Sequence, residues 1–214
     1  MSEGQTPDLA RKSPSQARAK RTIETILEAT AQILAEEGSE RLTTNYLARK
    51  AGFSVGTIYQ YFPNREAIVL ALIERQREAV ERRVRAVLVE GSGESAEARI
   101  GRIVNALHQA FNVHRMPERR LIQALLRVVA AQGLPAPANT VALAIHAIWA
   151  EAAGPGHPPL SESELFVLTH AVFETLRQAT LQGSPLLGAA EFEAAILRLV
   201  FGFLREGRAI APGD

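Results

Sequence analysis

Helical periodicity runs through almost all of this sequence of 214 residues, and no other feature constrains the fold as strongly. From about Ser15 onward, apolar side chains recur every three or four residues, in segments separated by Gly, Pro and Ser. That spacing places the apolar side chains on one face of an α-helix. We find no stretch of alternating β-branched residues bounded by turn residues, the pattern typical of strands. The sequence therefore predicts an all-α fold.

The composition excludes several classes of site. The chain contains no cysteine, which excludes disulfides, zinc sites with thiolate ligands, iron–sulfur clusters and cysteine nucleophiles. The histidines are scattered and no hydroxyl nucleophile has a catalytic context, so we expect no catalytic residue, cofactor or metal site. The N-terminal segment lacks a signal-peptide core, and no run approaches the roughly 18 apolar residues of a spanning helix. We therefore expect a cytoplasmic protein without a membrane segment.

Breaks in the periodicity divide the chain. Residues 1–15 are polar and contain two prolines, which favours a flexible tail. Short predicted helices fill 16–63, and one long helix is expected over 64–90, with Asn64 as its N-cap. A Gly-Ser-Gly linker then precedes four or five further helices in 91–214. The pattern predicts an N-terminal domain of three helices that is joined by a long helix to a C-terminal helical domain.

The segment from Leu42 to Leu70 carries the clearest functional signal. Two short predicted helices are separated by Ala51-Gly52-Phe53-Ser54. Gly52 permits a tight turn and Ser54 can cap the second helix, which together predict a helix–turn–helix. In this motif the second helix faces the major groove of DNA. Few charges lie on that helix here, so it can approach base edges closely.

Different side chains of the motif suit different parts of a duplex. Hydroxyl groups and the guanidinium of Arg65 suit phosphate oxygens, which set the register of a protein on DNA. The amides of Gln60 and Asn45 can pair with adenine, and Val55 can contact a thymine methyl. The predicted DNA-binding residues are Thr43, Thr44, Asn45, Ser54, Val55, Gly56, Thr57, Tyr59, Gln60, Tyr61 and Arg65.

Five cations precede the motif, with no acidic residue between Asp8 and Glu24: Arg11, Lys12, Arg18, Lys20 and Arg21. They are compatible either with a solvated tail or with an arm that lies along phosphates, and both alternatives stay open. Acidic residues of the N-terminal part gather instead at Glu36–Glu40. This separation of charge favours one side that faces phosphate.

The motif closely resembles the N-terminal signature of the TetR (tetracycline-repressor) family of bacterial regulators. The resemblance extends from Ile23 to Leu72 and is carried by Thr43-Thr44, Leu47-Ala48, Ala51–Phe62 and Asn64–Ala67. Two departures are mild: Phe53 replaces a smaller aliphatic residue, and Arg65 replaces the more common lysine. The resemblance implies a homodimer that binds a palindromic operator, together with a C-terminal domain that binds a small-molecule effector and then releases the DNA. Repression is the default in the family.

The last two predicted helices, Ser161–Gln182 and Ala189–Glu206, are apolar around most of their circumference. Such a helix must be covered on two sides. We expect one side to form the domain core and the other to pack against the same helices of a second subunit; burial within one subunit is the alternative. The predicted interface residues are Phe166, Phe173, Phe192, Ile196, Leu199, Val200 and Phe203.

Polar and aromatic residues next to the apolar stripes of the C-terminal helices are candidates for an effector pocket. Any single histidine among them fits a hydrogen-bonded core or surface residue better than a ligand contact. The candidate ligand-binding residues are His108, Phe111, Asn112, Gln123, His146, Trp149 and His170.

Three functions are compatible with these features. The first is a ligand-responsive transcriptional regulator, and the second is an all-α carrier or enzyme with an incidental helix–turn–helix. The third is a DNA-binding protein that dimerises without sensing a ligand. An enzyme requires a convergent catalytic set, which this sequence does not offer, so the sequence favours the first hypothesis.

Overall fold

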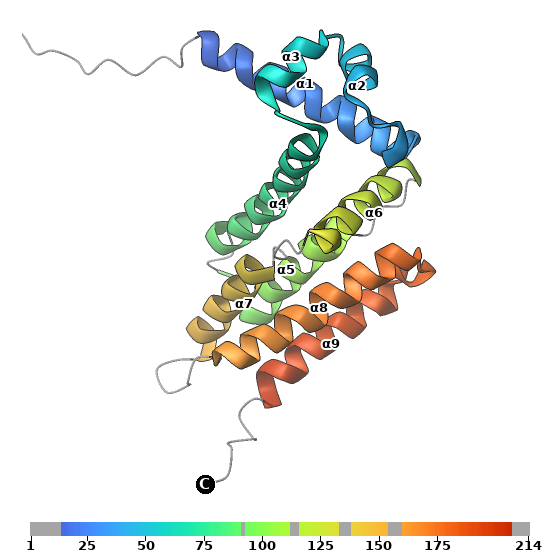
Figure 1. Ribbon diagram of the computed structural model, residues 1–214. Helices are drawn as coiled ribbons and strands as arrows, with labels where there is room; N and C mark the ends of the chain where they lie inside the picture. Colours follow the sequence, from blue (N-terminus) through green and yellow to red (C-terminus); the bar gives the residue numbers. More distant parts are fainter. Residues whose placement is uncertain (1–13, 91–92, 112–115, 133–137, 154–159, 207–214) are drawn as a thin grey trace, which may run out of the picture.

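The computed structural model describes residues 14–90, 93–111, 116–132, 138–153 and 160–206, and the structural statements below concern these residues. The regular elements within them are all helical, which confirms the predicted fold class. The α-helices are α1 (Pro14–Glu36), α2 (Thr44–Ala51), α3 (Val55–Tyr61), α4 (Arg65–Glu90), α5 (Ala96–Phe111), α6 (Met116–Ala131), α7 (Ala138–Ala153), α8 (Glu162–Gln182) and α9 (Ala190–Glu206), and two 3-10 turns are η1 (Ser39–Arg41) and η2 (Pro185–Gly188). In Figure 1, α1–α3 lie at one end of the molecule and α4 leads from them to the remaining helices. None of the helices in the described ranges is long and apolar enough to span a bilayer.

Side-chain caps set the starts of several helices, including α3, α4 and α8. Ser54 caps α3 and Asn64 caps α4, each accepting a hydrogen bond from the backbone nitrogen three residues later, at 3.0 and 2.8 Å. Ser161 and Glu164 form a reciprocal capping box at the start of α8. These caps satisfy backbone N–H groups that have no partner within the helix. The caps at Ser54 and Asn64 were expected from the sequence and are confirmed.

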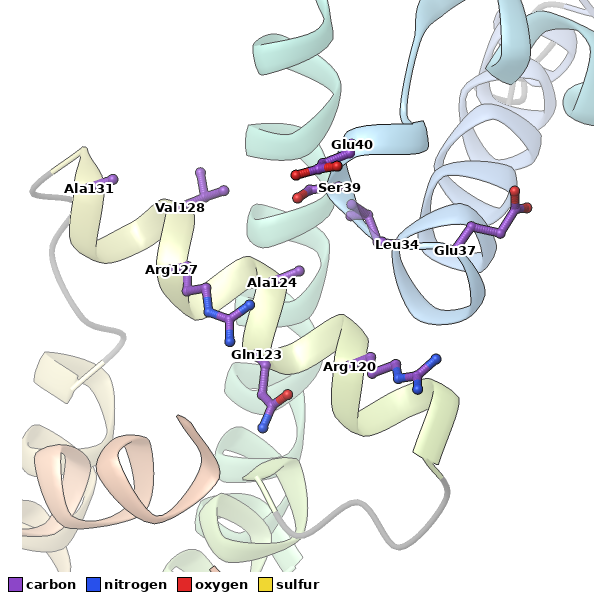
Figure 2. A pocket seen from close by; sticks show the side chains of 11 residues that line it. Leu34, Glu37, Ser39, Glu40, Arg120, Gln123, Ala124, Arg127, Val128 and Ala131 are labelled. Atoms are coloured by element: carbon purple, nitrogen blue, oxygen red, sulfur yellow. The ribbon is translucent and has the colours of Figure 1, made fainter. Parts of the chain in front are cut away.

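A first apolar cluster forms among α1, α2, α3 and the start of α4. Ile26, Ile33, Ile58 and Leu72 are its fully buried members. The helix α6 completes this cluster from the C-terminal part of the chain, since Leu125 is buried in it. We call the contact between α1 and α6 the α1–α6 seam; Figure 2 shows Leu34 of α1 on one side of it and Ala124 of α6 on the other.

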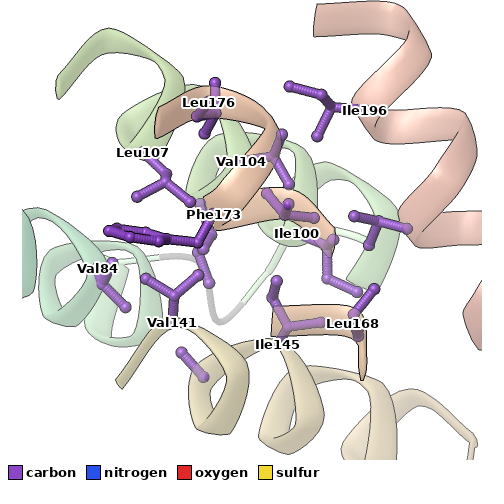
Figure 3. Close-up of a cluster of buried hydrophobic side chains, with 14 of the residues drawn as sticks. Val84, Ile100, Val104, Leu107, Val141, Ile145, Leu168, Phe173, Leu176 and Ile196 are labelled. Carbon is purple, nitrogen blue, oxygen red and sulfur yellow. The ribbon is translucent and has the colours of Figure 1, made fainter. Parts of the chain in front are cut away.

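A second apolar cluster forms among α5, α7, α8, α9 and the second half of α4 (Figure 3). Ile100, Ile103, Ile148 and Leu176 are fully inaccessible to solvent. Helix α4 supplies Leu72 to the first cluster and Val84 to the second, and α6 likewise contributes to both. Two helices therefore connect the two ends of the molecule mechanically.

Candidate nucleic-acid interface and ligand cavity

The helices α2 and α3 form the predicted helix–turn–helix. Gly52 ends α2 with a φ of 72°, a left-handed conformation that glycine adopts without strain. The backbone nitrogen of Phe53 then donates to the carbonyl of Ala48 at 2.9 Å, which closes the turn. Ile58 is fully buried under α3. Because Ile58 anchors one side of this seven-residue helix, its opposite side is held outward in a fixed orientation.

Three residues on the outer side of α3, namely Gly56, Tyr59 and Gln60, are exposed. Their spacing of three and four residues places them on one face, which we call the exposed face of α3. Tyr59 retains 53% of its accessible surface. No acidic residue occurs in α3. Among the other predicted DNA-binding residues, Thr43, Asn45, Ser54 and Arg65 are exposed, whereas Thr44, Val55, Thr57 and Tyr61 are half-buried.

Several hydroxyl groups of the motif have structural partners. The hydroxyl of Thr43 accepts from the backbone nitrogen of Tyr46 at 3.2 Å and so caps α2. The hydroxyls of Ser54 and Thr57 lie 2.8 Å apart. A hydroxyl that accepts a hydrogen bond still has its own hydrogen to donate. Thr43 can therefore cap a helix and donate to a phosphate oxygen at the same time.

Arg65 has protein partners at the start of α4. Its Nη2 lies 3.3 Å from the carboxylate of Glu66, and its Nη1 donates to the carbonyl of Leu42 at 3.5 Å. Both members of the ion pair are about half exposed, and such surface pairs are weak. The guanidinium can consequently exchange these partners for a phosphate at little cost.

Acidic residues near the motif are neutralised by a local network. Lys50 of α2 binds Glu36 at 3.0 Å and Glu37 at 3.1 Å, and the hydroxyl of Tyr46 donates to Glu37 at 2.8 Å. The hydrogen bond from Tyr46, followed by that from Lys50, lowers the pKa of Glu37. The same bond to Glu37 raises the pKa of Tyr46, and the bonds to Glu36 and Glu37 raise the pKa of Lys50. The network also fixes α2 against the end of α1.

A second pairing leaves the N-terminal helices with unpaired cations. Arg75 of α4 neutralises Glu24 and Glu28 of α1, at 3.4 and 3.8 Å. Within the described part of the chain, no ion pair involves the following basic residues: Arg18, Lys20, Arg21, Arg41 and Arg49. The predicted cations Arg11 and Lys12 lie outside the described residues. The paired acids thus leave a surplus of positive charge on α1, α2 and η1.

The chain matches the family model described as "Bacterial regulatory proteins, tetR family" over residues 26–72, which is the helix–turn–helix with its supporting helices. Residues 26–72 therefore carry the DNA-binding domain of the TetR family. The predicted resemblance to TetR-family regulators is confirmed.

Curated relatives and solved structures agree with this match. The chain is 40% identical over 68 residues to the nucleoid occlusion factor SlmA of Vibrio atlanticus, a segment of 31% of this chain and 35% of that protein. The chain thus spans only about a third of the length of its curated relatives. A TetR-family regulator of Streptomyces coelicolor aligns with a TM-score of 0.61 at 20% identity, over 88% of this chain and 99% of that one. The regulator FadR of Bacillus subtilis, solved with stearoyl-CoA, aligns with a TM-score of 0.59 at 18% identity, over 86% of this chain and 96% of that one. At these identities, the likeness to solved structures establishes the fold.

An apolar cavity of about 100 Å³ lies between α4, α5, α6 and α8. Its walls come from aliphatic residues and from the rings of Phe111 and Phe173. The polar residues of the lining are Gln76 and Arg77, neighbours on α4. Of the seven candidate ligand-binding residues, Phe111 alone lines this cavity, and Asn112 lies outside the described residues.

His108 has a structural environment in the core. Its Nδ1 lies 2.8 Å from the carboxylate of Glu193 in α9, and its Nε2 lies 2.9 Å from the carbonyl of Leu187 in η2. Asn105 donates to both carboxylate oxygens of Glu193, at 3.0 and 3.1 Å. The bond from Asn105 is the main cause that lowers the pKa of Glu193, and His108 lowers it further. We therefore place His108 in a polar clamp between α5, η2 and α9 rather than in the cavity.

The other candidate residues are spread over three helices. Gln123 of α6 donates to the carbonyl of Thr180 at 2.8 Å. His170 of α8 stacks on Phe166 with ring centroids 3.9 Å apart. On α7, Trp149 packs against the second apolar cluster, and the Nε2 of His146 is shielded without a hydrogen-bond partner among the described residues. The structure does not bring these side chains together in one site, and no group of three potential metal ligands occurs within the described ranges.

Gln123 instead borders a larger, open cleft at the α1–α6 seam (Figure 2). This cleft has a volume of about 560 Å³ and lies between Glu37, Ser39 and Glu40 on one side and α6 on the other. The α6 wall includes Arg120 and Arg127. The cleft combines charges of both signs, which distinguishes it from the apolar cavity.

The predicted dimer-interface residues divide into two groups. Phe173, Ile196 and Val200 are buried in the second apolar cluster, so the prediction that they face a partner is corrected: they fill the core of their own subunit. Phe166 and Leu199, by contrast, retain 60% and 44% of their accessible surface. Phe192 and Phe203 are half-buried. The helices α8 and α9 thus bury apolar side chains in the core on one side and expose apolar side chains to solvent on the other.

Gln76 and Arg77 are not among the residues predicted from the sequence. Arg77 lies on the inner stripe of α4 between Ile73 and Val80, at the spacing of three and four residues where an apolar side chain is expected. A charged residue within an apolar stripe could have indicated a polar group that faces the interior. It was overlooked because the helical periodicity on both sides of it is regular.

Proposed function

We propose that this TetR-family chain is a cytoplasmic transcriptional repressor that binds a palindromic operator as a homodimer and is released by a small-molecule effector. The exposed face of α3 is the observation that supports DNA binding most directly. That face lacks acidic groups, and five basic residues of α1, α2 and η1 take part in no ion pair within the described residues. Exposed phosphate-binding and base-facing groups on one side are the pattern expected of a DNA-binding domain.

A homodimer would place two such faces on the two halves of a palindrome. Its proposed interface uses the exposed side of α8 and α9, where Phe166 and Leu199 are open to solvent. Gly202 of α9 has no atoms around its Cα that would meet an added Cβ, and Ala195 is exposed. Small residues beside exposed apolar ones allow a second helix to approach closely. Half-sites of an operator would then lie about one helical turn, or a multiple of it, apart.

Effector release would work as a shift between two conformations. A molecule in the apolar cavity contacts α4 and α6 directly, and both helices also contribute to the apolar cluster under α3. A change in either helix would change the separation of the two recognition helices in a dimer. A coupling free energy of about 1–3 kcal/mol would reduce operator affinity by roughly 5- to 150-fold.

DNA binding is tested by an isosteric change of charge. Replacement Gln60→Glu puts a carboxylate on the exposed face of α3, and Gln109→Glu makes the same change at an exposed position of α5. In fluorescence anisotropy with a pool of random-sequence 40-bp duplexes at low salt, wild type and Gln109→Glu should bind alike. Gln60→Glu should bind about tenfold more weakly or worse, because a carboxylate would face the duplex. Equal affinity of the two variants would contradict the proposed interface.

The dimer is tested in the same way. Phe166→Glu introduces a charge at the proposed interface, whereas Val89→Glu introduces one at the end of α4, where Val89 is 78% exposed. Sedimentation at micromolar concentration should show dimers for wild type and Val89→Glu and monomers for Phe166→Glu. A monomeric wild type, or a Phe166→Glu variant that stays dimeric, would rule out this interface.

A further inference from the structure

The apolar cavity receives all its polar side chains from one helix. Leu107, Ala110 and Phe111 of α5, four residues of α6 and Phe173 of α8 form apolar walls. Gln76 and Arg77 of α4 supply the polar groups of the lining. Binding sites of this kind use apolar walls for affinity and a few polar groups for orientation. The chemistry of Gln76 and Arg77 therefore decides which molecules the cavity selects.

Arg77 has an unused hydrogen-bond donor. Its Nε is shielded from solvent and has no hydrogen-bond partner in the described part of the chain. A buried N–H without a partner costs free energy, and an acceptor that reaches it recovers that cost. A bound molecule with an acceptor group would supply the hydrogen-bond partner that Arg77 Nε lacks among the described residues.

The charge of Arg77 is already balanced. Its Nη1 lies 3.3 Å from Glu74 and its Nη2 lies 3.8 Å from Glu81, while Arg85 binds Glu81 at 3.1 Å. Two carboxylates thus accompany two guanidinium groups on this stretch of α4. An anionic ligand would have to approach both carboxylates, and a cationic ligand would meet the guanidinium of Arg77. Electrostatics consequently favours a neutral acceptor.

From the placement of these groups, we propose that the cavity binds a small neutral molecule with an apolar body and one carbonyl group, such as a ketone, ester or amide. The carbonyl oxygen accepts the Nε–H of Arg77, and Gln76 is the other polar residue of the lining. The inference rests on the proposed ligand-responsive function, since it assigns a chemical class to that effector. A cavity of about 100 Å³ limits the buried part to a few carbon atoms, because an apolar cavity of about 150 Å³ is known to hold benzene.

The site would also let the ligand form a hydrogen bond directly with α4. Since Gln76 and Arg77 belong to the helix that leads from the cavity to α3, the carbonyl group would act on that helix, whereas the apolar body would contact all four walls. Molecules without a carbonyl group would fill the space but lack this directed contact.

A matched series of ring compounds tests the proposed class. Cyclopentanone, cyclopentane, cyclopentanecarboxylate and cyclopentylammonium are titrated into the ¹⁵N-labelled full-length protein, and binding is followed by the amide shifts of residues that line the cavity. We expect cyclopentanone to bind about five- to tenfold more tightly than each of the other three, the range that one hydrogen bond contributes. Tighter binding of the carboxylate, equal binding of cyclopentane, or the absence of shifts at the cavity with every compound would overturn the proposal.

Two arginine variants test the role of Arg77. Arg77→Met removes the Nε donor but keeps a long apolar side chain, and Arg85→Met removes the other arginine that pairs with Glu81. Cyclopentanone should lose its advantage over cyclopentane in Arg77→Met and keep it in Arg85→Met. The same loss in both variants would overturn the assignment to Arg77. The comparison of the four compounds on the wild type needs no variant and decides the chemical class even if Arg77→Met fails to fold.

The anisotropy assay with random duplexes separates this inference from the proposed function. A protein that binds cyclopentanone selectively but binds no duplex would contradict the proposed function. The same result would support the proposed ligand class of the cavity. A protein that binds duplexes but shows no preference for cyclopentanone would leave the DNA-binding function standing and overturn the cavity chemistry.

Discussion

The two ends of the chain would perform their proposed functions in different ways. At the N-terminal end, the groups proposed to meet DNA lie on the outside of a short helix, and local features such as Ser54, Gly52 and the buried Ile58 fix that helix. At the C-terminal end, the proposed effector site is a space between four helices, and its lining residues extend from Ile73 to Phe173. The first site is specified by neighbours along the chain, and the second by the packing of the whole domain.

The same difference appears in the matches to known proteins. The family model matches residues 26–72, whereas a solved structure that aligns over 88% of the chain shares 20% of its residues. A surface that must fit a DNA groove restricts each side chain. A helical bundle accepts many combinations of apolar residues as long as volume and pattern are kept.

Two substitutions in the apolar clusters should have the largest effect on the free energy of unfolding. They test whether the two ends of the molecule unfold together. Ile26→Ala in the first apolar cluster and Ile100→Ala in the second each remove a fully buried side chain, which should cost about 2–5 kcal/mol. Because α4 and α6 belong to both clusters, we expect one cooperative transition in each variant. Urea unfolding at fixed protein concentration checks this by circular dichroism and by the fluorescence of Trp149, the single tryptophan.

In both variants the two signals should share one midpoint. A biphasic circular dichroism curve for Ile26→Ala, with an unchanged fluorescence midpoint, would show that the two ends unfold independently and would remove the mechanical link from the proposed mechanism.

A pair of glycine variants separates folding from DNA binding. Gly52→Ala forces a side chain into the φ of 72° that closes the turn, which should cost about 1–2 kcal/mol. Gly56 lies in α3, and a Cβ there would meet only the Ser54 hydroxyl at an ordinary 3.7 Å. Gly56→Ala should therefore fold as well as wild type or better, by up to about 1 kcal/mol, yet bind duplexes more weakly because the methyl group projects from the exposed face. Thermal unfolding and anisotropy measure the two effects, and unchanged DNA binding by Gly56→Ala would argue against close contact at this position.

The clamp at the C-terminal end should respond to acid. Asn105 and His108 lower the pKa of Glu193 below its ordinary value of 4.5. A lowered pKa contributes stability above the ordinary value, and that stability is lost as the pH falls through the lower pKa of the folded protein. Glu193→Gln should be less stable than wild type by about 1 kcal/mol at pH 7, and the difference should shrink below about pH 4.5. Urea midpoints between pH 7 and pH 3 check this; Glu191→Gln, an exposed position on the same helix, serves as the control, and identical pH curves for both variants would contradict the clamp.

The smallest expected effect concerns a single phosphate contact. Arg65→Ala should weaken binding to all duplexes about equally and reduce the slope of log affinity against log salt by about one unit. Its stability should change by less than about 1 kcal/mol, because the ion pair with Glu66 is exposed. Arg85→Ala, an exposed arginine farther along α4, should leave the slope unchanged. The same slope in both variants would remove Arg65 from the DNA interface.

The sequence predicted the N-terminal end well and the C-terminal end only in outline. The caps at Ser54 and Asn64 and the turn at Gly52 follow from local rules, so they could be found without a structure. His108 appeared as a pocket candidate because it flanks an apolar stripe, but its partners Glu193 and Leu187 lie about 80 residues away and no local pattern reveals them. Likewise, helical periodicity shows that Val200 is apolar and buried, yet it does not decide between a core and a partner subunit.

Sequence selection tests the central claim most directly. The purified chain is used to enrich binding sites from a library of random duplexes, in parallel with Gln60→Ala. The account predicts an inverted repeat whose half-sites lie about 10–10.5 bp apart, or a multiple of that. In Gln60→Ala the same symmetry should remain, with relaxed preference at the same position of both half-sites and a loss of about 1–3 kcal/mol on the preferred site. Enrichment of no sequence, or of a single unpaired site, would contradict the claim that a homodimer presents α3 twice to a duplex.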